Sequence, residues 1–388
     1  MRPTNFHWPV IVAPLLVLGI LAACEEEAPA APSVAAGPAP TLVASPQATA
    51  EASPAPTATP VALKIALLLP DSTLARYDAK DRPVFESKIK SLCADCVVLY
   101  SNANQDASLQ RAQADAAIAG GASALVIDPV NRDAAAEIAD RAKAQKVPVV
   151  SYDQLINGSD GVDCYVSYDP EEAGRLQGSA LLDSLGGGAN PAVVMIDGPA
   201  GDAAATLLKQ GAHSVLDGKV AVAKEYDTAG FDPDAAQGEM SQALAALNNK
   251  VDGVYAATDG LAGGAIAALK TAGVKPPRPV TGRGAELAAI QRIVAGDQYM
   301  TVYQPIQPQA EAAATVALTL ARAASDGPAA AQGKVTNNGK KDVPSVLLRP
   351  VAVTRGSIAS TVIADGYWDK DQICTPVFAD ACAAAGLN

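Results

Sequence analysis

The sequence predicts an α/β protein with two parallel sheets, each flanked by helices. From about residue 61 onward, short apolar runs alternate with segments of helical spacing, the pattern of strand–helix units joined by right-handed crossovers. Some of these runs are apolar at almost every position, as in strands buried on both faces. The chain has 388 residues, and domains usually contain about 100 to 200 residues, so the length favours two.

The first part of the folded region begins with residues 63–69, which read LKIALLL and predict a buried strand. The spacing of apolar residues then predicts helices and strands in alternation. We expect strands at 96–100, 124–127, 147–152 and 164–167, and helices at 85–92, 109–118 and about 134–144.

The second part continues the same alternation, with helical patterns between most of the strands. We expect strands at 192–196, 220–224, 253–257, 280–282, 300–303 and 346–353. The two parts together give about ten strand–helix units, which fit two sheets better than one.

The N-terminus has the pattern of a bacterial lipoprotein signal peptide, residues 1–23. Arg2 precedes an apolar stretch at 10–21, which is shorter than the roughly 20 residues of a membrane-spanning helix and fits a signal-peptide core. Leu21-Ala22-Ala23-Cys24 resembles a lipobox, so we expect Cys24 to become a lipid-attached N-terminus. The alternative is an ordinary signal peptide followed by a chance cysteine.

Residues 24–61 predict a disordered tether, because they consist mainly of Ala, Pro, Thr and Ser. Such a segment buries too little apolar surface to offset the loss of chain entropy. We therefore expect a protein held to a cell membrane on its extracytoplasmic side, in the periplasm or at the cell surface, where disulfides form.

Charge and composition argue against several classes of function. The chain has 41 acidic and 29 basic residues, a formal net charge of −12 and two histidines. No basic face for nucleic acid is expected. With His7 in the signal peptide, His213 cannot build a multi-histidine zinc site alone. We expect no cofactor or metal, and no enzyme, because the strand ends carry no phosphate-binding loop and no nucleophile–base pair.

Ligands of open parallel sheets bind at the carboxyl ends of the strands. The segments that follow the expected strands are rich in Asp, Asn, Gln and Thr, with a few aromatic residues. They are residues 70–80, 102–104, 128–131, 153–154, 197–205, 227–231, 258–259 and 283–284. Carboxylates and amides bond hydroxyl groups, and an aromatic face covers the C–H side of a ring. These segments therefore suit a neutral polyol.

A series of short motifs runs in order from about residue 64 to residue 365. The motifs are Arg76-Tyr77, 80–82, 101–104, Tyr152-Asp153, 156–157, 165–169, Asp259 with 262–266, 300–303 with 305–306, and 337–339 with 341–345. In this order they resemble the periplasmic sugar-binding proteins of type I fold, and most closely the D-xylose-binding components of ABC transporters.

The resemblance implies a two-lobed fold of two helix-flanked parallel sheets, with three crossing segments and a sugar in the cleft. Matching positions place the crossings near 167–169, 282–284 and 303–305. The N-terminal lobe would comprise 62–167 and 284–303, and the C-terminal lobe 169–281 and 305–370, followed by a tail at 371–388. We expect a monomer.

The resemblance also implies a set of ligand-binding positions. They are Arg76, Tyr77, Lys80, Asp153, Gln154, Asp202, Phe231, Thr258, Asp259, Arg283 and Gln304. Simpler roles remain open for several of them. Tyr77 and Phe231 suit plain core or surface positions, Asp153 a cap or turn, and Arg283 the surface of a hinge, while Arg76 could pair with nearby aspartates.

Several positions depart from the family pattern. Gln154 replaces an arginine, Ala203 and Ala204 replace asparagines, Arg283-Gly284 replaces Gln-Asp, Gln304 replaces a lysine, Thr258 replaces an asparagine, and Phe231 replaces a tryptophan. A lost buried hydrogen bond costs about 1–3 kcal/mol when its partner stays unpaired. We therefore expect a sugar or polyol that differs from xylose, with a pocket that has lost affinity as the alternative.

The cysteines fit an oxidising compartment. Similar tails in relatives imply a disulfide between Cys374 and Cys382. Cys93 and Cys96 favour a structural disulfide across a turn, with a redox-active pair as the alternative. Cys164, on an expected buried strand, is expected to be a free thiol.

Two functions remain in view. The first is a lipoprotein that captures a monosaccharide, a xylose-like pentose or related sugar, and delivers it to an ABC permease. The second is a ligand sensor that partners a membrane receptor or kinase without transport.

Overall fold

The computed structural model describes residues 62–73, 76–187, 189–323 and 333–387, which belong to one compact unit. The predicted signal peptide, the predicted lipid-attachment residue Cys24 and the predicted tether all lie outside the described residues. Within the described ranges, no helix has the length and apolar character that crossing a membrane requires.

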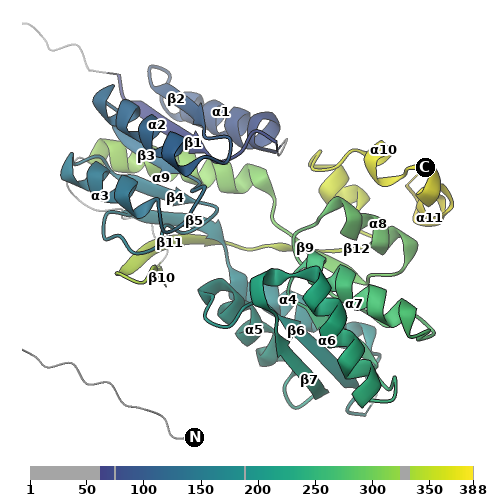
Figure 1. Ribbon diagram of the computed structural model, residues 1–388. Helices are drawn as coiled ribbons and strands as arrows, with labels where there is room; N and C mark the ends of the chain where they lie inside the picture. The colour runs from purple at the N-terminus through teal and green to yellow at the C-terminus, as the bar shows by residue number, and fades with distance from the viewer. Residues whose placement is uncertain (1–61, 74–75, 188, 324–332, 388) are drawn as a thin grey trace, which may run out of the picture. The chain divides into compact units, whose positions relative to one another are not determined.

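The first sheet has seven strands in the order β10-β11-β5-β4-β3-β1-β2 (Figure 1). All neighbouring strands are parallel except β10, which pairs antiparallel with β11. The strands are β1 (Lys64–Leu69), β2 (Val97–Asn102), β3 (Ala124–Ile127), β4 (Val149–Tyr152), β5 (Cys164–Tyr168), β10 (Lys334–Asn337) and β11 (Asp342–Leu348).

Both faces of this sheet are covered by helices. The helices are α1 (Arg82–Leu92), α2 (Ala107–Ala119), α3 (Ala136–Ala144) and α9 (Ile306–Ala323). Side chains of a strand alternate between faces. Leu67 in β1 therefore packs with α1 and α9, and the adjacent Leu68 packs with α2 and α3. This two-sided burial explains why β1 is apolar at nearly every position.

The second sheet has the parallel order β7-β6-β8, formed by β6 (Ala192–Asp197), β7 (Ala221–Asp227) and β8 (Gly253–Ala256). Its helices are α4 (Pro170–Ser184), α5 (Ala203–Leu216), α6 (Pro233–Ala246) and α7 (Asp259–Thr271). A Cβ on Gly174 of α4 would overlap the carbonyl oxygen of Leu208 in α5. The backbones of α4 and α5 therefore touch, which fixes the position of α5 against the sheet.

A separate two-stranded antiparallel ribbon and a group of C-terminal helices complete the described structure. β9 (Met300–Tyr303) pairs antiparallel with β12 (Val351–Thr354). The helices α8 (Leu287–Ala295), α10 (Lys370–Ile373) and α11 (Ala379–Ala384) pack together, with Ile290, Ile358 and Ile373 in a shared apolar core. The structure joins Cys374 to Cys382 by a disulfide in this region.

The predicted lobe assignment is wrong for β9, α9, β10 and β11, whereas β12 lies in the expected half because it pairs with β9. α9, β10 and β11, expected in the C-terminal lobe, belong to the first sheet, because α9 buries Ala313 and Ala317 in its core and β11 pairs with β5. β9, expected in the N-terminal lobe, buries Met300 and Val302 in the core of the second sheet. The chain therefore passes between the sheets at 168–170, 303–306 and 348–351.

Two predicted elements near these crossings need correction. Residues 282–284 do not cross between the sheets as expected. They remain beside the second sheet, because Val280 forms a β-bridge with Val254 of β8 and Arg283 forms one with Val302 of β9. The expected strand at 346–353 is two strands, because the chain leaves β11 after Leu348 and enters β12 at Val351 (Figure 1). Pro350, which lacks an N–H donor, lies at this break.

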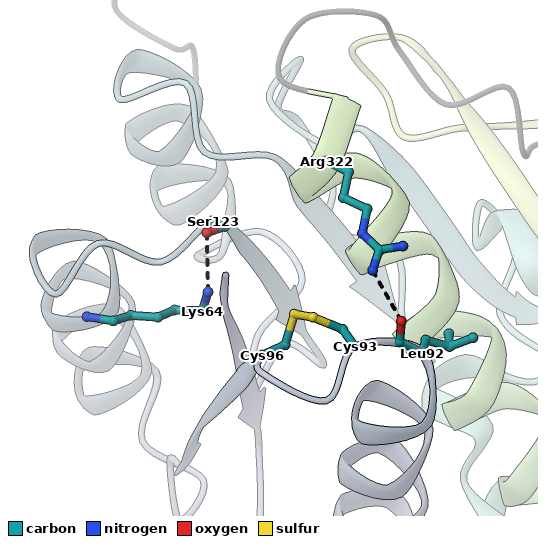
Figure 2. Close-up of a disulfide and its surroundings, with 6 residues drawn as sticks. All are labelled: Lys64, Leu92, Cys93, Cys96, Ser123 and Arg322. Carbon is teal, nitrogen blue, oxygen red and sulfur yellow. Dashed lines mark hydrogen bonds between the residues drawn. A yellow bond between two sulfur atoms is a disulfide. The ribbon is translucent and has the colours of Figure 1, made fainter. Parts of the chain in front are cut away.

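A second disulfide joins Cys93 to Cys96 in the turn between α1 and β2 (Figure 2). Beside it, Arg322 of α9 donates a hydrogen bond of 3.2 Å to the carbonyl oxygen of Leu92, the last residue of α1. This turn precedes β2, so the disulfide lies at the amino end of the first sheet. Cys164 is a buried free thiol, and burial raises its pKa to about 11.

Candidate binding site

A cavity of about 230 Å³ lies between residues of the first sheet and residues of the second. Its lining includes Asp153, Gln154, Arg283 and Gln304, all predicted ligand-binding positions, and the two alanines noted as departures. The remaining lining residues are Arg132, Leu155, Tyr165, Ser167, Tyr168, Pro170, Leu207, Thr336 and Leu347. Among the described residues, no group of three or more His, Cys, Asp or Glu side chains is arranged to hold a metal ion.

Asp153 forms a rigid part of this lining. It follows β4 with a left-handed backbone (φ 61°), a conformation in which Asp is tolerated better than most residues. One carboxylate oxygen accepts a hydrogen bond of 3.2 Å from Arg76, and the other accepts one of 2.9 Å from Gln309. The hydroxyls of Tyr165 and Ser167 both donate to its carbonyl oxygen. Asp153 is therefore oriented by four contacts before any ligand arrives.

Arg76 supports Asp153 from outside the cavity lining. Its guanidinium makes two hydrogen bonds of 3.0 Å to the carboxylate of Asp81, which is only 1% exposed. The Tyr152 hydroxyl also donates to Asp81. Burial raises the pKa of Asp81, and the positive charge of Arg76 opposes that rise. Arg76 thus acts on the cavity through Asp153. The alternative role, pairing with a nearby aspartate, is present with Asp81, although this carboxylate is buried and not on the surface.

Two other predicted residues near Arg76 lie away from the cavity. Tyr77 is buried in the core of the first sheet, close to the fully buried carboxyl group of Asp128, whose pKa burial raises well above its usual range. Lys80 lies beside the C-terminal segment, since a Cβ on Gly366 would be 3.0 Å from the Lys80 amine. Neither side chain lines the cavity, so the structure does not support direct ligand contact for either.

Asp259 was predicted to bind ligand, and the structure corrects this. Its side chain is fully buried, and one oxygen accepts a hydrogen bond of 2.8 Å from Gln298. The other accepts bonds from the Thr301 hydroxyl at 2.8 Å and the Glu286 backbone N–H at 3.1 Å. With every oxygen occupied inside the protein, Asp259 is a structural carboxylate that ties α7 to α8 and β9.

Three further predicted residues have local roles at helix ends. Thr258 caps α7 by accepting from the Leu261 N–H. Phe231 packs against Gly198, where a Cβ would overlap its ring, and does not line the cavity. Asp202 caps α5 by accepting from the Ala205 N–H at 2.8 Å, and its second oxygen faces Arg132.

Arg132 is a cavity residue that the sequence analysis did not identify. Its Nε donates to the Leu155 carbonyl oxygen at 3.2 Å, and its Nη1 donates to Asp202 at 3.3 Å. Arg132 follows β3 of the first sheet and Asp202 caps a helix of the second, so this ion pair joins the two halves. A charged residue just beyond the strand-end segment 128–131 was the available signal.

Arg283 brings a second guanidinium to the cavity. Its Nε is buried and has no hydrogen-bond partner, and Tyr255 nearby has a buried hydroxyl that is also unpartnered. Burial of an unpaired donor is unfavourable by about 1–3 kcal/mol. The alternative role of Arg283 as a surface charge at a hinge therefore does not describe its position, because it lines the cavity between the two halves.

The chain is similar to known proteins over most of its length. A family model described as "Periplasmic binding protein domain" matches residues 65–325. The D-xylose-binding periplasmic protein of Escherichia coli (strain K12) is 37% identical over 316 residues, which are 80% of this chain and 92% of that protein. The multiple sugar-binding periplasmic protein SbpA of Azospirillum brasilense is 32% identical over 329 residues, covering 79% and 90% of the two chains.

Two solved structures share the fold and some sequence. A carbohydrate transporter solute-binding protein from Chloroflexus aurantiacus, in complex with D-glucose, is 28% identical with a TM-score of 0.63, over 80% of this chain and 98% of that chain. An ABC transporter solute-binding protein from Clostridium phytofermentans, with bound β-D-glucose, is 26% identical with a TM-score of 0.62, over 80% and 99%. The two-lobed α/β architecture is thus that of these relatives.

Proposed function

The chain belongs to the periplasmic binding protein family, and from this premise we propose that it captures a monosaccharide outside the cytoplasm and delivers it to an ABC permease. The observation that carries the proposal is the cavity between the two sheets, which residues of both halves line. A ligand that bonds both halves at once favours the closed arrangement over any open one.

The lining suits a small polyhydroxylated ring. Gln154, Gln304, Ser167 and Thr336 supply neutral donors and acceptors, and Tyr165 supplies an aromatic ring. The volume of about 230 Å³ is below the roughly 300–1,000 Å³ of drug-sized sites. A single sugar ring therefore suits the cavity better than an oligosaccharide. The ligand leaves chemically unchanged in this proposal.

The relatives support the sugar class, and the departures at the cavity argue against unaltered xylose recognition. Both curated relatives are named for sugars, and the two solved structures hold glucose. Gln154, Ala203, Ala204 and Gln304 all lie on the cavity wall. The differences from the xylose-type pattern are therefore located where they would alter ligand choice.

We also propose that Cys24 carries a lipid that anchors the protein on the extracytoplasmic side of a membrane, with residues 25–61 as a tether. Mass spectrometry of the N-terminal peptide from membranes of expressing cells tests this. A diacylated cysteine at position 24 supports the anchor, and a free amine at any other residue contradicts it.

Thermal unfolding of the full-length protein with a panel of pentoses, hexoses and polyols tests the binding function. A ligand at 100 times its dissociation constant stabilises the fold by about 2.7 kcal/mol, a shift of a few degrees in Tm. Uptake of the identified sugar should then be lost in cells that lack this protein and be restored by its gene. No Tm shift with any sugar contradicts the proposal. Intact uptake together with a lost ligand-dependent receptor or kinase response would favour a sensor instead.

A further inference from the structure

We propose that the ligand of this cavity carries a carboxylate, so that the substrate class is a sugar acid (an aldonate or a uronate) and not a neutral sugar. This inference rests on the proposed function and deepens it. It depends on the charges of the cavity wall and on which of them are already paired within the protein.

The cavity wall has a surplus of positive charge. Its permanently charged or readily ionised side chains are Arg132, Arg283 and Asp153. Asp153 is the only carboxylate among the lining residues, and both of its oxygens are already engaged by Arg76 and Gln309. The salt bridge to Arg76 also compensates its charge from behind the wall. Arg132 is paired with Asp202, so the unpaired charge of the cavity wall is that of Arg283.

Of the two arginines, Arg283 gives the stronger reason to expect an acidic ligand. The described residues provide no hydrogen bond or ion pair to its guanidinium, and its Nε is buried. A guanidinium has five N–H donors and no acceptor, so only an acceptor can satisfy it. A carboxylate matches its fork geometry with two parallel, charge-assisted hydrogen bonds. A neutral hydroxyl would leave the charge of Arg283 uncompensated.

The residue after Arg283 adds no side chain, because position 284 is glycine with φ 131°. A Cβ there would lie 3.5 Å from the Asp259 carboxylate and 3.8 Å from the Glu286 carboxylate. The Asp259 oxygens are already engaged by Gln298, Thr301 and the Glu286 N–H, and neither carboxylate lines the cavity or bonds the Arg283 side chain.

Arg132 adds a second contact on the opposite half. Its Nε and Nη1 are engaged by the Leu155 carbonyl oxygen and by Asp202, which leaves further N–H donors on the same guanidinium. Asp202 is about one-quarter exposed and also caps α5, so it offsets the charge of Arg132 only in part. A ligand carboxylate or adjacent hydroxyl can then bond Arg132 and Arg283 together across the two halves.

Isothermal titration of the full-length protein with matched pairs tests the proposal. The pairs are D-xylose with D-xylonate, D-glucose with D-gluconate and D-glucuronate, and D-galactose with D-galacturonate, so the arms separate aldonates from uronates. We expect one acid to bind about tenfold to a hundredfold more tightly than its neutral partner, the effect of one charged hydrogen-bonded pair. Raised ionic strength should weaken acid binding and leave neutral-sugar binding unchanged.

Substitutions of the arginines test whether they cause the preference for an acid over its neutral partner. Arg283→Gln should reduce the ratio of acid to neutral affinity by about tenfold or more, and Arg283→Lys should retain part of that ratio because it keeps the charge. Arg278→Gln is the matched control, because Arg278 also has a buried, unpartnered Nε but lines a separate cavity of about 460 Å³. Far-UV circular dichroism and Tm of each variant show whether it is folded.

The outcomes separate this inference from the proposed function. Tighter binding of a neutral sugar than of every acid overturns the inference and leaves the sugar-receptor proposal intact. An acid preference that Arg283→Gln and Arg132→Gln both preserve, in folded proteins, also overturns it. If neither acids nor neutral sugars bind, the proposed function itself fails.

Discussion

An aspartate lies just beyond the carboxyl end of a strand in each of the two sheets. One of these aspartates lines the cavity and the other is buried. Asp153 follows β4 of the first sheet and lines the cavity, where Arg76 and Gln309 orient it. Asp259 follows β8 of the second sheet and is sealed inside, where Gln298, Thr301 and Glu286 occupy its oxygens. A strand end thus predicts where a carboxylate lies but not whether it faces the ligand.

The difference arises from what packs beyond each strand end. At the first sheet, Tyr165 and Ser167 hold the backbone of Asp153 and leave its side chain at the cavity wall. At the second sheet, the segment containing α8 and β9 covers Asp259, and Arg292 donates to its carbonyl oxygen. The first sheet therefore contributes a preorganised polar wall, and the second contributes one cation, Arg283, together with small and apolar residues at helix starts.

The largest expected effect comes from Arg76→Ala. This change leaves the buried carboxylate of Asp81 without its cation and releases Asp153, and breaking a buried ion pair destabilises by about 3–5 kcal/mol. Urea unfolding measures the loss, and titration measures the accompanying loss of ligand affinity. Arg82→Ala is the control, since its pair with Glu86 is solvent-exposed and worth about 1 kcal/mol or less. Equal destabilisation by both changes would contradict the supporting role of Arg76.

Asp259→Ala should destabilise the fold by about 3 kcal/mol or more, because each buried donor left unpaired is unfavourable by about 1–3 kcal/mol. Ligand affinity of the folded fraction should stay unchanged, because the Asp259 carboxylate bonds Gln298, Thr301 and Glu286 and no lining residue, while the backbone bond from Asp259 to Arg283 does not depend on the side chain. Asp297→Ala, which breaks a pair with the exposed Lys270, is the control for stability. A strong loss of affinity at unchanged stability would restore Asp259 as a ligand-binding residue.

Asp197, the last residue of β6, gives a pH-dependent prediction for the second sheet. Burial raises its pKa from 3.8 to about 6, against the attraction of Lys209. The folded state therefore binds more protons than the unfolded state between about pH 4 and 6, and stability falls as pH rises through that window. The penalty above pH 6 is on the order of 2–3 kcal/mol.

Asp197→Asn should remove that penalty, so the variant gains stability relative to the parent as pH rises from about 4 to 6. Unfolding free energies of both proteins across this range provide the measurement. Asp227→Asn is the matched control, because Asp227 contacts the same lysine from a more exposed position. Parallel pH profiles for the parent and Asp197→Asn would contradict the raised pKa.

The smallest effect is expected from Asp202→Asn. Asparagine still caps α5, while the ion pair with Arg132 across the cavity is lost. Since both partners are partly exposed, stability should change by about 1 kcal/mol or less. Small-angle scattering without ligand should show a shift toward more extended conformations, and no shift would show that the pair does not hold the halves together.

Some elements and site residues could be predicted from the sequence, and others could not. The strand at β1 was predictable because its apolar residues recur without interruption, and Asp153 and Gln154 were predictable because they follow such a strand. Tyr77 and Phe231 were not separable from ligand-binding aromatics, because an aromatic residue that packs in a core has the same local pattern. Arg132 was missed because its importance depends on Asp202, which is 70 residues away in the chain.

The sequence by itself determined the α/β class, the order of most strands and helices, and some of the segments from which the cavity is built. These follow from local periodicity, which each stretch of chain carries on its own. The tertiary structure decided which sheet residues 284–348 join, which carboxylates are sealed and which face the cavity, and that arginines from the two halves line one cavity. Those outcomes depend on packing between distant segments, where the burial of a whole helix or strand outweighs any local preference.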